Sequence, residues 1–454
     1  MHKTWYLVAI SLLLILMVLP LSSCHYGTTL YGVPAPKFTS NDIVGTIWDE
    51  ELMIGAGERI EQYRKGDATI LVTDANGNQV EARVTAEMLK HDFLFGCNLL
   101  NLNICNPSQL DKDYADAFIK LFNYGTLPFF WDGYEPRAGC TLEEYLRASA
   151  IWAKNHDITT QGHPLIWAKS IPSWANQTPD EMEKMQRSRV SDTVKKFRGL
   201  IDYWDVMNEP SLASSEDNAL GRWIKIRTPE TVTNDALAWA SCTESKLIVN
   251  DYNVSNNYLS ILKGVIQQGG HLDAIGIQSH MHTGVWRLNY IWDICNRFGQ
   301  LGVPLQFTEV TVLSGAATDA SNSANHNQGW GTTNSEGEAL QANYTKALYT
   351  LLFSHPSVES ITWWDLSDLN SWQGAPSGLL RGDMSPKPAY NQLMKLIHSD
   401  WWTHIDISSS SDGKAKWRGF YGLYRLTIES GNRKVTTNIH LAKGSDNVFM
   451  VKLP

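Results

Sequence analysis

The stretch Tyr203-Trp204-Asp205-Val206-Met207-Asn208-Glu209-Pro210 decides how the rest of this chain is interpreted. Its apolar and aromatic residues predict a buried strand that carries the polar pair Asn208 and Glu209 to its C-terminal end, and Pro210 stops the strand there. A second run, Leu305-Gln306-Phe307-Thr308-Glu309, also ends in an acid. Either glutamate alone would ordinarily be a solvated loop residue, so their interpretation depends on the elements around them.

Between residues 91 and 398, eight apolar runs alternate with segments of helix length. The runs are Phe93–Cys97, Tyr124–Pro128, Thr160–His163, Trp204–Asn208, Leu247–Asn250, Ala274–Gln278, Leu305–Thr308 and Ile361–Trp364. Parallel strands covered on both faces read as continuous apolar runs, so this order predicts an α/β fold, a (β/α)8 TIM barrel. Active sites of such barrels lie at the C-terminal strand ends, so Glu209 and Glu309 should share one face. Paired carboxyl groups of this kind indicate glycosidase chemistry.

The segments between the strands carry local signals of their own. Two of them begin with the residue pattern of a capping box: Thr141 with Glu144, and Thr178 with Glu181. The segment Ser314 to Glu338 is too long and too rich in Ser, Asn, Gly and Thr for an ordinary connection, which is typical of a lid, a binding loop or a disordered segment. Trp330 within it is either a platform for a sugar or a hydrophobic pin.

Other strand ends add polar residues to the same face. They are His163, Asn250 with Asp251, His280, and Trp364 with Asp365. The run Ser279-His280-Met281-His282 has no carboxylate at ligand spacing within it, so we expect neither a metal nor a cofactor. Four polar strand ends that converge with two acids favour a catalytic or binding face over isolated structural residues.

The two flanks of the barrel have the pattern of β structure. Short alternating runs from Arg59 to about Lys90 predict a β element over residues 51 to 90, in which Asp74-Ala75-Asn76-Gly77-Asn78 is a hairpin signal. Residues 399 to 454 are again strand-like with polar turns. Neither flank is long enough to bury a core alone, so we expect both to pack together as one accessory β domain beside the barrel.

The N-terminus is typical of an exported chain. Lys3 precedes an apolar run from Leu7 to Leu19, which is short for a membrane span and indicates a signal peptide over residues 1 to 23. Leu21-Ser22-Ser23-Cys24 resembles a bacterial lipobox, so we expect lipidation of Cys24, a tether over residues 24 to 50, and a lipoprotein anchored at the bacterial cell envelope. A plain cleaved signal and free secretion are the alternative.

The amino-acid composition indicates which classes of partner the protein can bind. The net charge of -9, without any run of Lys or Arg, disfavours nucleic acid. The 18 Trp and 17 Tyr suit stacking on sugar faces, although any single Trp is more often a core residue. We expect a monomer whose only membrane contact is the lipid anchor. Without Cys24 an odd number of cysteines remains, which spacing does not pair: Cys97, Cys105, Cys140, Cys242 and Cys295.

Several motifs together give a family resemblance across roughly residues 92 to 395. They are Trp204 to Glu209, Phe307 to Val310, Gly162 to Trp167, Ile171 to Trp174, Ile275 to His280, Ile361 to Asp368 with Ser371-Trp372, and Pro386 to Tyr390. With these motifs the chain resembles glycoside hydrolase family 10, the retaining endo-β-1,4-xylanases. The resemblance implies hydrolysis of internal β-1,4 linkages in a plant-type polysaccharide, xylan first, by double displacement through two carboxylates.

The resemblance also implies roles for particular residues. Glu209 would be the general acid/base and Glu309 the nucleophile, with their carboxyl groups about 5 to 5.5 Å apart. His280 would hold Glu309 ionised and oriented, and Asn208 would reach the 2-hydroxyl of the sugar in the cleavage subsite. The other residues implied in substrate binding are His163, Trp167, Gln278, Trp364 and Trp372.

Three positions depart from the family pattern. The signature Asn-Glu-x-x-Lys-Trp after strand two, which contacts sugars, is replaced by Leu127-Pro128-Phe129-Phe130-Trp131-Asp132. Ala168 stands where a second His is usual, and Thr311 where an Asp often supports the strand-six His. The alternatives are therefore a β-glucanase or decorated-xylan enzyme of the same mechanism, and a surface glycan-binding lipoprotein without turnover.

Overall fold

The computed structural model of this chain describes residues 50–175, 177–315 and 330–454. The predicted signal peptide, Cys24 and the tether up to residue 49 lie outside the described residues, as does the middle of the segment from Ser314 to Glu338. No helix in the described ranges has both the length and the apolar character needed to cross a membrane.

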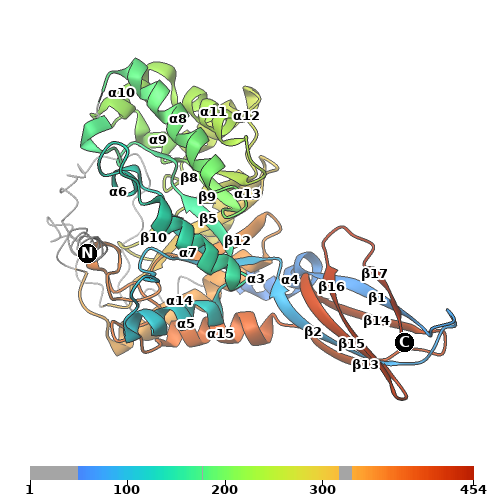
Figure 1. The fold of residues 1–454 in the computed structure, drawn as a ribbon. Coiled ribbons are helices and arrows are strands. Elements are labelled where there is room, and N and C mark those ends of the chain that lie inside the picture. Colours follow the sequence, from blue (N-terminus) through green and yellow to red (C-terminus); the bar gives the residue numbers. More distant parts are fainter. Residues whose placement is uncertain (1–49, 176, 316–329) are drawn as a thin grey trace, which may run out of the picture.

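Eight parallel strands form the closed barrel that the sequence predicts (Figure 1). They are β3 (Leu94–Asn98), β4 (Tyr124–Pro128), β5 (Thr159–His163), β7 (Tyr203–Asn208), β8 (Lys246–Asp251), β9 (Ala274–Ile277), β11 (Leu305–Val312) and β12 (Val358–Trp363). Pairing of β12 with both β11 and β3 closes the ring. Two short strands, β6 (Ile166–Trp167) and β10 (His280–Met281), extend it beside β7 and β11.

Tight packing fixes neighbouring strands against each other. A Cβ at Gly162 of β5 would lie only 2.1 Å from the Trp204 indole of β7, so only glycine allows this approach. Trp204 is fully buried, and its ring centroid lies 4.7 Å from that of Phe129. Close packing of this kind sets where the end of β7, and with it Glu209, is placed.

Helices surround the barrel. They are α5 (Gln109–Leu121), α6 (Trp131–Tyr134), α7 (Glu143–Asn155), α8 (Pro179–Lys196), α9 (Pro210–Ala213), α10 (Ala219–Arg227), α11 (Pro229–Ala240), α12 (Asn256–Gln267), α13 (Leu288–Gly299), α14 (Ser335–Ser354) and α15 (Pro388–Lys395), with 3-10 turns at Ser173–Ala175 and Trp372–Gly374 and a π turn at Leu396–Asp400. The capping box of Thr178 and Glu181 is present at α8. The one expected at Thr141 and Glu144 is absent, because α7 begins at Glu143 after Leu142.

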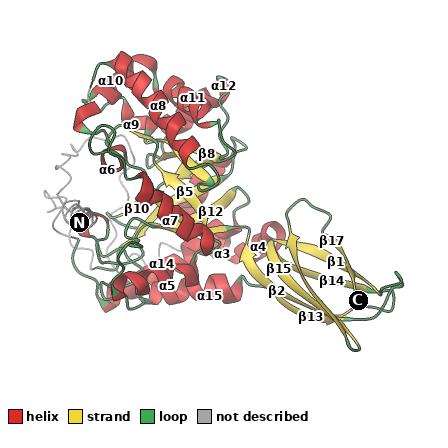
Figure 2. Ribbon diagram, viewed as in Figure 1, coloured by secondary structure: helices red, strands yellow, loops and turns green. Residues whose placement is uncertain are grey.

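The flanking segments build one accessory β domain, as predicted (Figure 2). One sheet contains β14 (Lys414–Phe420), β1 (Lys65–Thr73) and β17 (Val448–Lys452); the other contains β13 (His404–Ser408), β2 (Arg83–His91), β15 (Gly422–Ser430) and β16 (Arg433–Leu441). Trp417 of the first sheet packs against Tyr424 of the second, with ring centroids 4.9 Å apart. Strands from both flanks thus share a single core.

The expectation of β structure throughout residues 51 to 90 is wrong for its first part. Residues before β1 form two helices, α3 (Glu50–Ile54) and α4 (Ala56–Arg64). This segment is rich in the helix formers Glu, Ala, Met and Arg, and the alternating pattern starts only at β1. Ala56 and Ile60 are buried, and Arg59 donates to Ser354 at the end of α14, so α4 connects the accessory domain to the barrel.

Candidate active site

Glu209 directly follows β7, and Glu309 lies in the second half of β11, which continues to Val312 and so runs past the end expected at Thr308; one polar network contains both residues. The Gln278 amide donates to Glu209 Oε1 at 3.3 Å and to Asn208 Oδ1 at 3.1 Å. The Asn250 amide donates to the same Asn208 oxygen at 2.9 Å and to Glu309 Oε1 at 2.8 Å. A continuous series of hydrogen bonds through three amide side chains therefore joins the two carboxyl groups across the barrel mouth.

Glu309 is buried and yet held in its ionised form. Only 4% of its surface is exposed. Burial by itself raises the pKa of Glu309, but the nearby His163, the hydrogen bond from His280 and the Asn250 amide more than offset this, so the pKa is lowered from its ordinary value. A carboxylate that stays ionised and accepts fixed hydrogen bonds is suited to nucleophilic attack.

His280 supports Glu309 through a hydroxyl partner. Its Nε2 lies 2.9 Å from Glu309 Oε2, and its Nδ1 lies 2.9 Å from the Thr311 hydroxyl. A threonine hydroxyl can either donate or accept, so it can orient the imidazole in more than one protonation state. Thr311, where the family often has an Asp, thus keeps a hydrogen bond to the His280 ring. It lacks the negative charge that an Asp would place behind that ring.

His163 at the end of β5 places a second imidazole beside Glu309. Its Nδ1 lies 2.6 Å from Asp205 Oδ2, and its Nε2 lies 3.9 Å from Glu309 Oε1. Burial lowers the pKa of His163, but the carboxylates of Glu309 and Asp205 outweigh burial, so the pKa is raised from its ordinary value. The ring therefore tends to carry positive charge next to Glu309.

Glu209 occupies a strained backbone position between β7 and α9. Its φ of 55° and ψ of 49° lie in the left-handed region, which a side chain other than glycine seldom adopts. Its N–H donates to the Asn250 carbonyl at 2.7 Å. Just beyond it, Asp251 accepts the Ser211 N–H at 2.9 Å, and burial raises the pKa of Asp251 to about 7. These contacts maintain the turn that aims Glu209 into the site.

Three tryptophans line the site where the sequence predicted them. Trp364 is buried and packs edge-on against His163 and His280, with ring centroids 5.6 and 5.8 Å away. Trp372 is 38% exposed and lies over His280, with ring centroids 4.4 Å apart. Within the described part of the chain, the indole nitrogens of Trp167 and Trp364 are buried without a hydrogen-bond partner.

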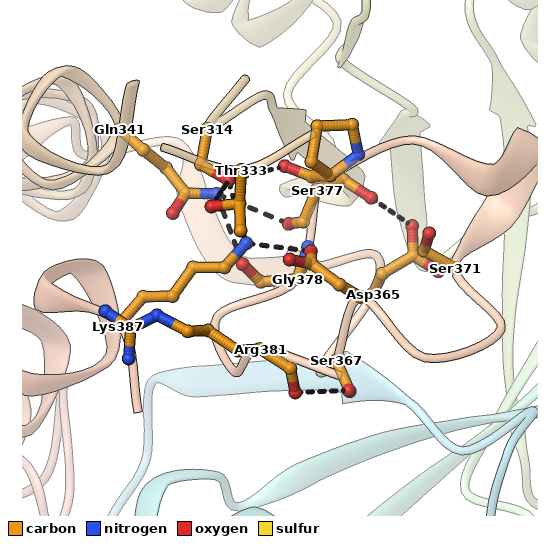
Figure 3. Close-up of polar contacts among 12 residues, drawn as sticks. Ser314, Thr333, Gln341, Asp365, Ser367, Ser371, Ser377, Gly378, Arg381 and Lys387 are labelled. Atoms are coloured by element: carbon orange, nitrogen blue, oxygen red, sulfur yellow. Dashed lines mark hydrogen bonds and ion pairs between the residues drawn. The ribbon is translucent and has the colours of Figure 1, made fainter. Parts of the chain in front are cut away.

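Buried polar contacts fix the loop after β12 that carries Trp372 (Figure 3). The fully buried Lys387 ammonium donates to Ser314 Oγ at 2.8 Å and to Asp368 Oδ1 at 2.7 Å. Asp365 accepts the Ser377 hydroxyl at 2.7 Å and the Trp372 N–H at 3.1 Å. Burial raises the pKa of Asp365 to about 6. The loop is thus part of the packed structure, and it presents Trp372 in a defined place.

The segment Leu127 to Asp132, at the end of the second barrel strand β4, is mainly apolar where the family has its polar signature. Leu127 is fully buried. The Phe130 ring centroid lies 5.3 Å from that of His163 and 5.7 Å from that of Trp167. This departure therefore places an aromatic ring, that of Phe130, beside His163 and Trp167.

Lys169 was not predicted from the sequence. Its ammonium lies 2.8 Å from Glu209 Oε2. The only signal available was its position directly after the Ala168 departure, and a residue type alone does not reveal a contact with a distant strand.

Among the described residues, no group of three or more His, Cys, Asp and Glu side chains is arranged to hold a metal ion.

The fold and the site define a class, the closed (β/α)8 barrels that carry two buried glutamates on the C-terminal side of the sheet. The chain belongs to glycosyl hydrolase family 10, whose family model matches residues 131–396. It is 25% identical over 287 residues to endo-1,4-beta-xylanase B of Thermotoga neapolitana, which covers 59% of this chain and 78% of that protein. Its fold matches xylanase 10B from Thermotoga petrophila RKU-1 in complex with xylobiose, with a TM-score of 0.58, 21% identity, and coverage of 68% of this chain and 95% of that one.

A longer match extends beyond the barrel. The anti-sigma-I factor RsgI6 of Acetivibrio thermocellus is 24% identical over 430 residues, which cover 91% of this chain and 51% of that protein. Endo-1,4-beta-xylanase 1 of Arabidopsis thaliana is 22% identical, over 87% of this chain and 40% of that protein. The chain thus spans about half or less of the length of these two relatives.

Proposed function

We propose that this protein is a retaining endo-β-1,4-glycan hydrolase acting on xylan, with Glu309 as nucleophile and Glu209 as general acid/base. The observation that carries the proposal is the amide network joining two buried glutamates on the C-terminal side of a family 10 barrel. The names of several relatives as endo-1,4-beta-xylanases support xylan as the first substrate to test.

In the first step, Glu309 attacks the anomeric carbon while Glu209 gives its proton to the leaving oxygen, and the glycosidic bond breaks. The products are a glycosyl ester on Glu309 and a shortened polysaccharide. The low pKa of Glu309 keeps its attacking oxygen unprotonated. Asn208, oriented by two amide donors on its carbonyl oxygen, is placed to contact the 2-hydroxyl of the sugar.

In the second step, Glu209 is the general base. It takes a proton from water as the water oxygen attacks the anomeric carbon, and the bond to Glu309 breaks. Two displacements at one carbon retain the β configuration. The carboxyl separation of about 5 to 5.5 Å that retention requires stays a prediction.

The mainly apolar segment at the end of β4, Leu127 to Asp132, favours two rival functions. Replacement of the polar signature by Leu127, Pro128 and Phe130 favours a β-glucan or a decorated xylan as substrate of the same mechanism. It also favours a surface glycan-binding protein without turnover. The anti-sigma-I factor RsgI6, which matches 91% of this chain, does not carry the name of a hydrolase. The retained pair of glutamates favours turnover.

A reducing-sugar assay separates these functions. Purified protein and Glu309→Ala are incubated with glucuronoxylan, arabinoxylan, mixed-linkage β-glucan and cellulose. We expect release from xylan by the unaltered protein, and a loss of at least about a thousandfold in Glu309→Ala, which lacks the nucleophile. Release from β-glucan alone would reassign the substrate. No release from any glycan, with retardation in xylan-containing gels, would establish the binding function.

We also infer anchoring of the chain at a bacterial envelope through Cys24, from the lipobox-like Leu21-Ser22-Ser23-Cys24. Cys24→Ser should release activity from the membrane fraction with catalytic constants unchanged, because the tether precedes the fold. Retention of Cys24→Ser in that fraction would contradict the inference.

A further inference from the structure

A buried cation touches the general acid/base, and the mechanism above assigns it no role. Lys169 Nζ lies 2.8 Å from Glu209 Oε2, with side-chain exposures of 13% and 9%. Gln278 donates to the other oxygen, Oε1, at 3.3 Å. Each oxygen of Glu209 thus has its own donor, which limits rotation of the carboxyl group.

The segment that carries Lys169 is fixed on both sides. The Ser170 N–H donates to the Trp167 carbonyl at 3.1 Å, and the Ser170 hydroxyl donates to Asp132 Oδ1 at 2.5 Å. The Asn218 amide donates to the Ala168 carbonyl at 2.7 Å. These contacts come from α6 and from the residue preceding α10. Two separate parts of the barrel therefore fix the backbone from which the Lys169 side chain extends.

Aromatic rings flank the ammonium itself. Lys169 Nζ lies 5.9 Å from the Trp167 ring centroid and 5.7 Å from that of Tyr252. Rings at this distance attract a cation through their electron-rich faces. A lysine held by rings on its flanks and a carboxylate at its tip is positioned, whereas an exposed lysine would sample many rotamers.

We propose that Lys169 is a positioning residue for Glu209, an inference that rests on the function proposed above. It holds the carboxylate of Glu209 in the orientation from which it takes a proton from water in the second step. In that step the water oxygen bonds to the anomeric carbon, the water proton moves to Glu209, and Glu309 leaves as a carboxylate. The first step with an activated aryl leaving group needs no proton from Glu209, so it should not depend on Lys169.

The test uses Lys169→Met in the full chain, with 2,4-dinitrophenyl β-xylobioside as substrate. The pre-steady-state burst reports the first step, its amplitude reports the folded active fraction, and the steady state reports the second step. We expect a burst rate within about twofold of the unaltered protein and a steady-state rate lower by about tenfold, a part of what general base catalysis contributes. Azide attacks the anomeric carbon without a base, so it should restore turnover and yield the β-xylobiosyl azide.

Three further proteins make the result decisive. Glu209→Ala should show the same pattern more strongly. Lys169→Gln, which keeps a hydrogen-bond donor, should lie between Lys169→Met and the unaltered protein. Lys154→Met is the matched control, because Lys154 pairs with Asp202 at 2.5 Å near the opposite ends of the strands. It should leave the burst, steady state and azide response unchanged.

The outcomes separate the two proposals. If the unaltered protein turns over and Glu209→Ala is rescued by azide, but Lys169→Met matches the unaltered protein, the role of Lys169 is refuted alone. The same holds if burst and steady state fall together in Lys169→Met without an azide response, since that pattern indicates general damage to the site. An unaltered protein without any turnover overturns both proposals.

Discussion

At the scale of single residues, His280 helps to keep the carboxyl group of Glu309 ionised. The pKa of Glu309 is lowered, and the hydrogen bond from His280 is one of the contributions that offset burial. His280→Ala should therefore raise the pKa of Glu309 and move the acid limb of kcat/KM to higher pH, because that limb reports the free enzyme's ionised nucleophile.

Thr311→Val should move the same limb in the same direction by less, since it removes only the hydroxyl behind His280. The measurement is the pH dependence of kcat/KM for an aryl xylobioside. An acid limb that stays in place in His280→Ala would contradict this account of Glu309.

Asp365 provides a stability prediction. Its pKa of about 6 in the folded chain lies above its ordinary value of 3.8, so the folded state favours the protonated form. Stability is therefore lost as the pH rises from about 4 through 6. Asp365→Asn, which matches the protonated form in shape, should stabilise the protein at pH 8 by up to about 3 kcal/mol and change little at pH 4. Thermal melts at both pH values test this; equal effects at both would refute it.

At the scale of elements, the strands were predictable and some of their ends were not. The eight barrel strands are buried on both faces, so their apolar runs mark them in the sequence. The strands β6 and β10 have two residues each, too few for any period to appear. The capping box that Thr178 and Glu181 predict is present at the start of α8. The similar pattern at Thr141 and Glu144 forms no capping box, because the N-cap of α7 is Leu142, whose side chain has no hydrogen-bond acceptor.

The candidate site likewise contains residues that the sequence located and contacts that it did not reveal. Glu209 follows β7, His280 follows β9 by three residues, and Glu309 lies in the second half of β11, so the order of elements locates all three on the C-terminal side of the barrel. The contacts of Lys169 and Thr311 depend on distances between separate strands and loops, which no local pattern contains. The mainly apolar segment that contains Phe130 was visible as a departure, but its position against His163 required the fold.

The loop after β12 depends on one buried ion pair. Lys387→Met leaves the partly buried Asp368 without its cation, so we expect a loss of up to about 3 kcal/mol in the free energy of unfolding. Lys387→Met combined with Asp368→Asn should lose less than the single variant, because no unpaired charge remains. Denaturant unfolding of both variants measures this. A double variant at least as unstable as the sum of the two single ones would contradict the assignment of a coupled pair.

At the scale of the whole molecule, barrel and accessory domain should unfold together. The Arg64 guanidinium of α4 donates to the carbonyls of Phe353 at the end of α14, of His355 after that helix, and of Val358 at the start of β12. Phe353 also stacks on Trp401, with ring centroids 4.2 Å apart. Calorimetry should therefore show one transition, and Arg64→Met should lower its Tm through a loss of about 2 to 5 kcal/mol. Two separate transitions in the unaltered protein would contradict this coupling.

The central claim is that Glu309 and Glu209 act as nucleophile and acid/base in a retaining hydrolysis. The most direct measurement is the anomeric configuration of the first product, followed by proton NMR as the protein cleaves xylohexaose. Two displacements at the anomeric carbon predict that the β anomer appears first and that the α anomer grows later by mutarotation. An α anomer as the first product would require single displacement by water and carboxyl groups about 6.5 to 9.5 Å apart, which would contradict the roles assigned to both glutamates.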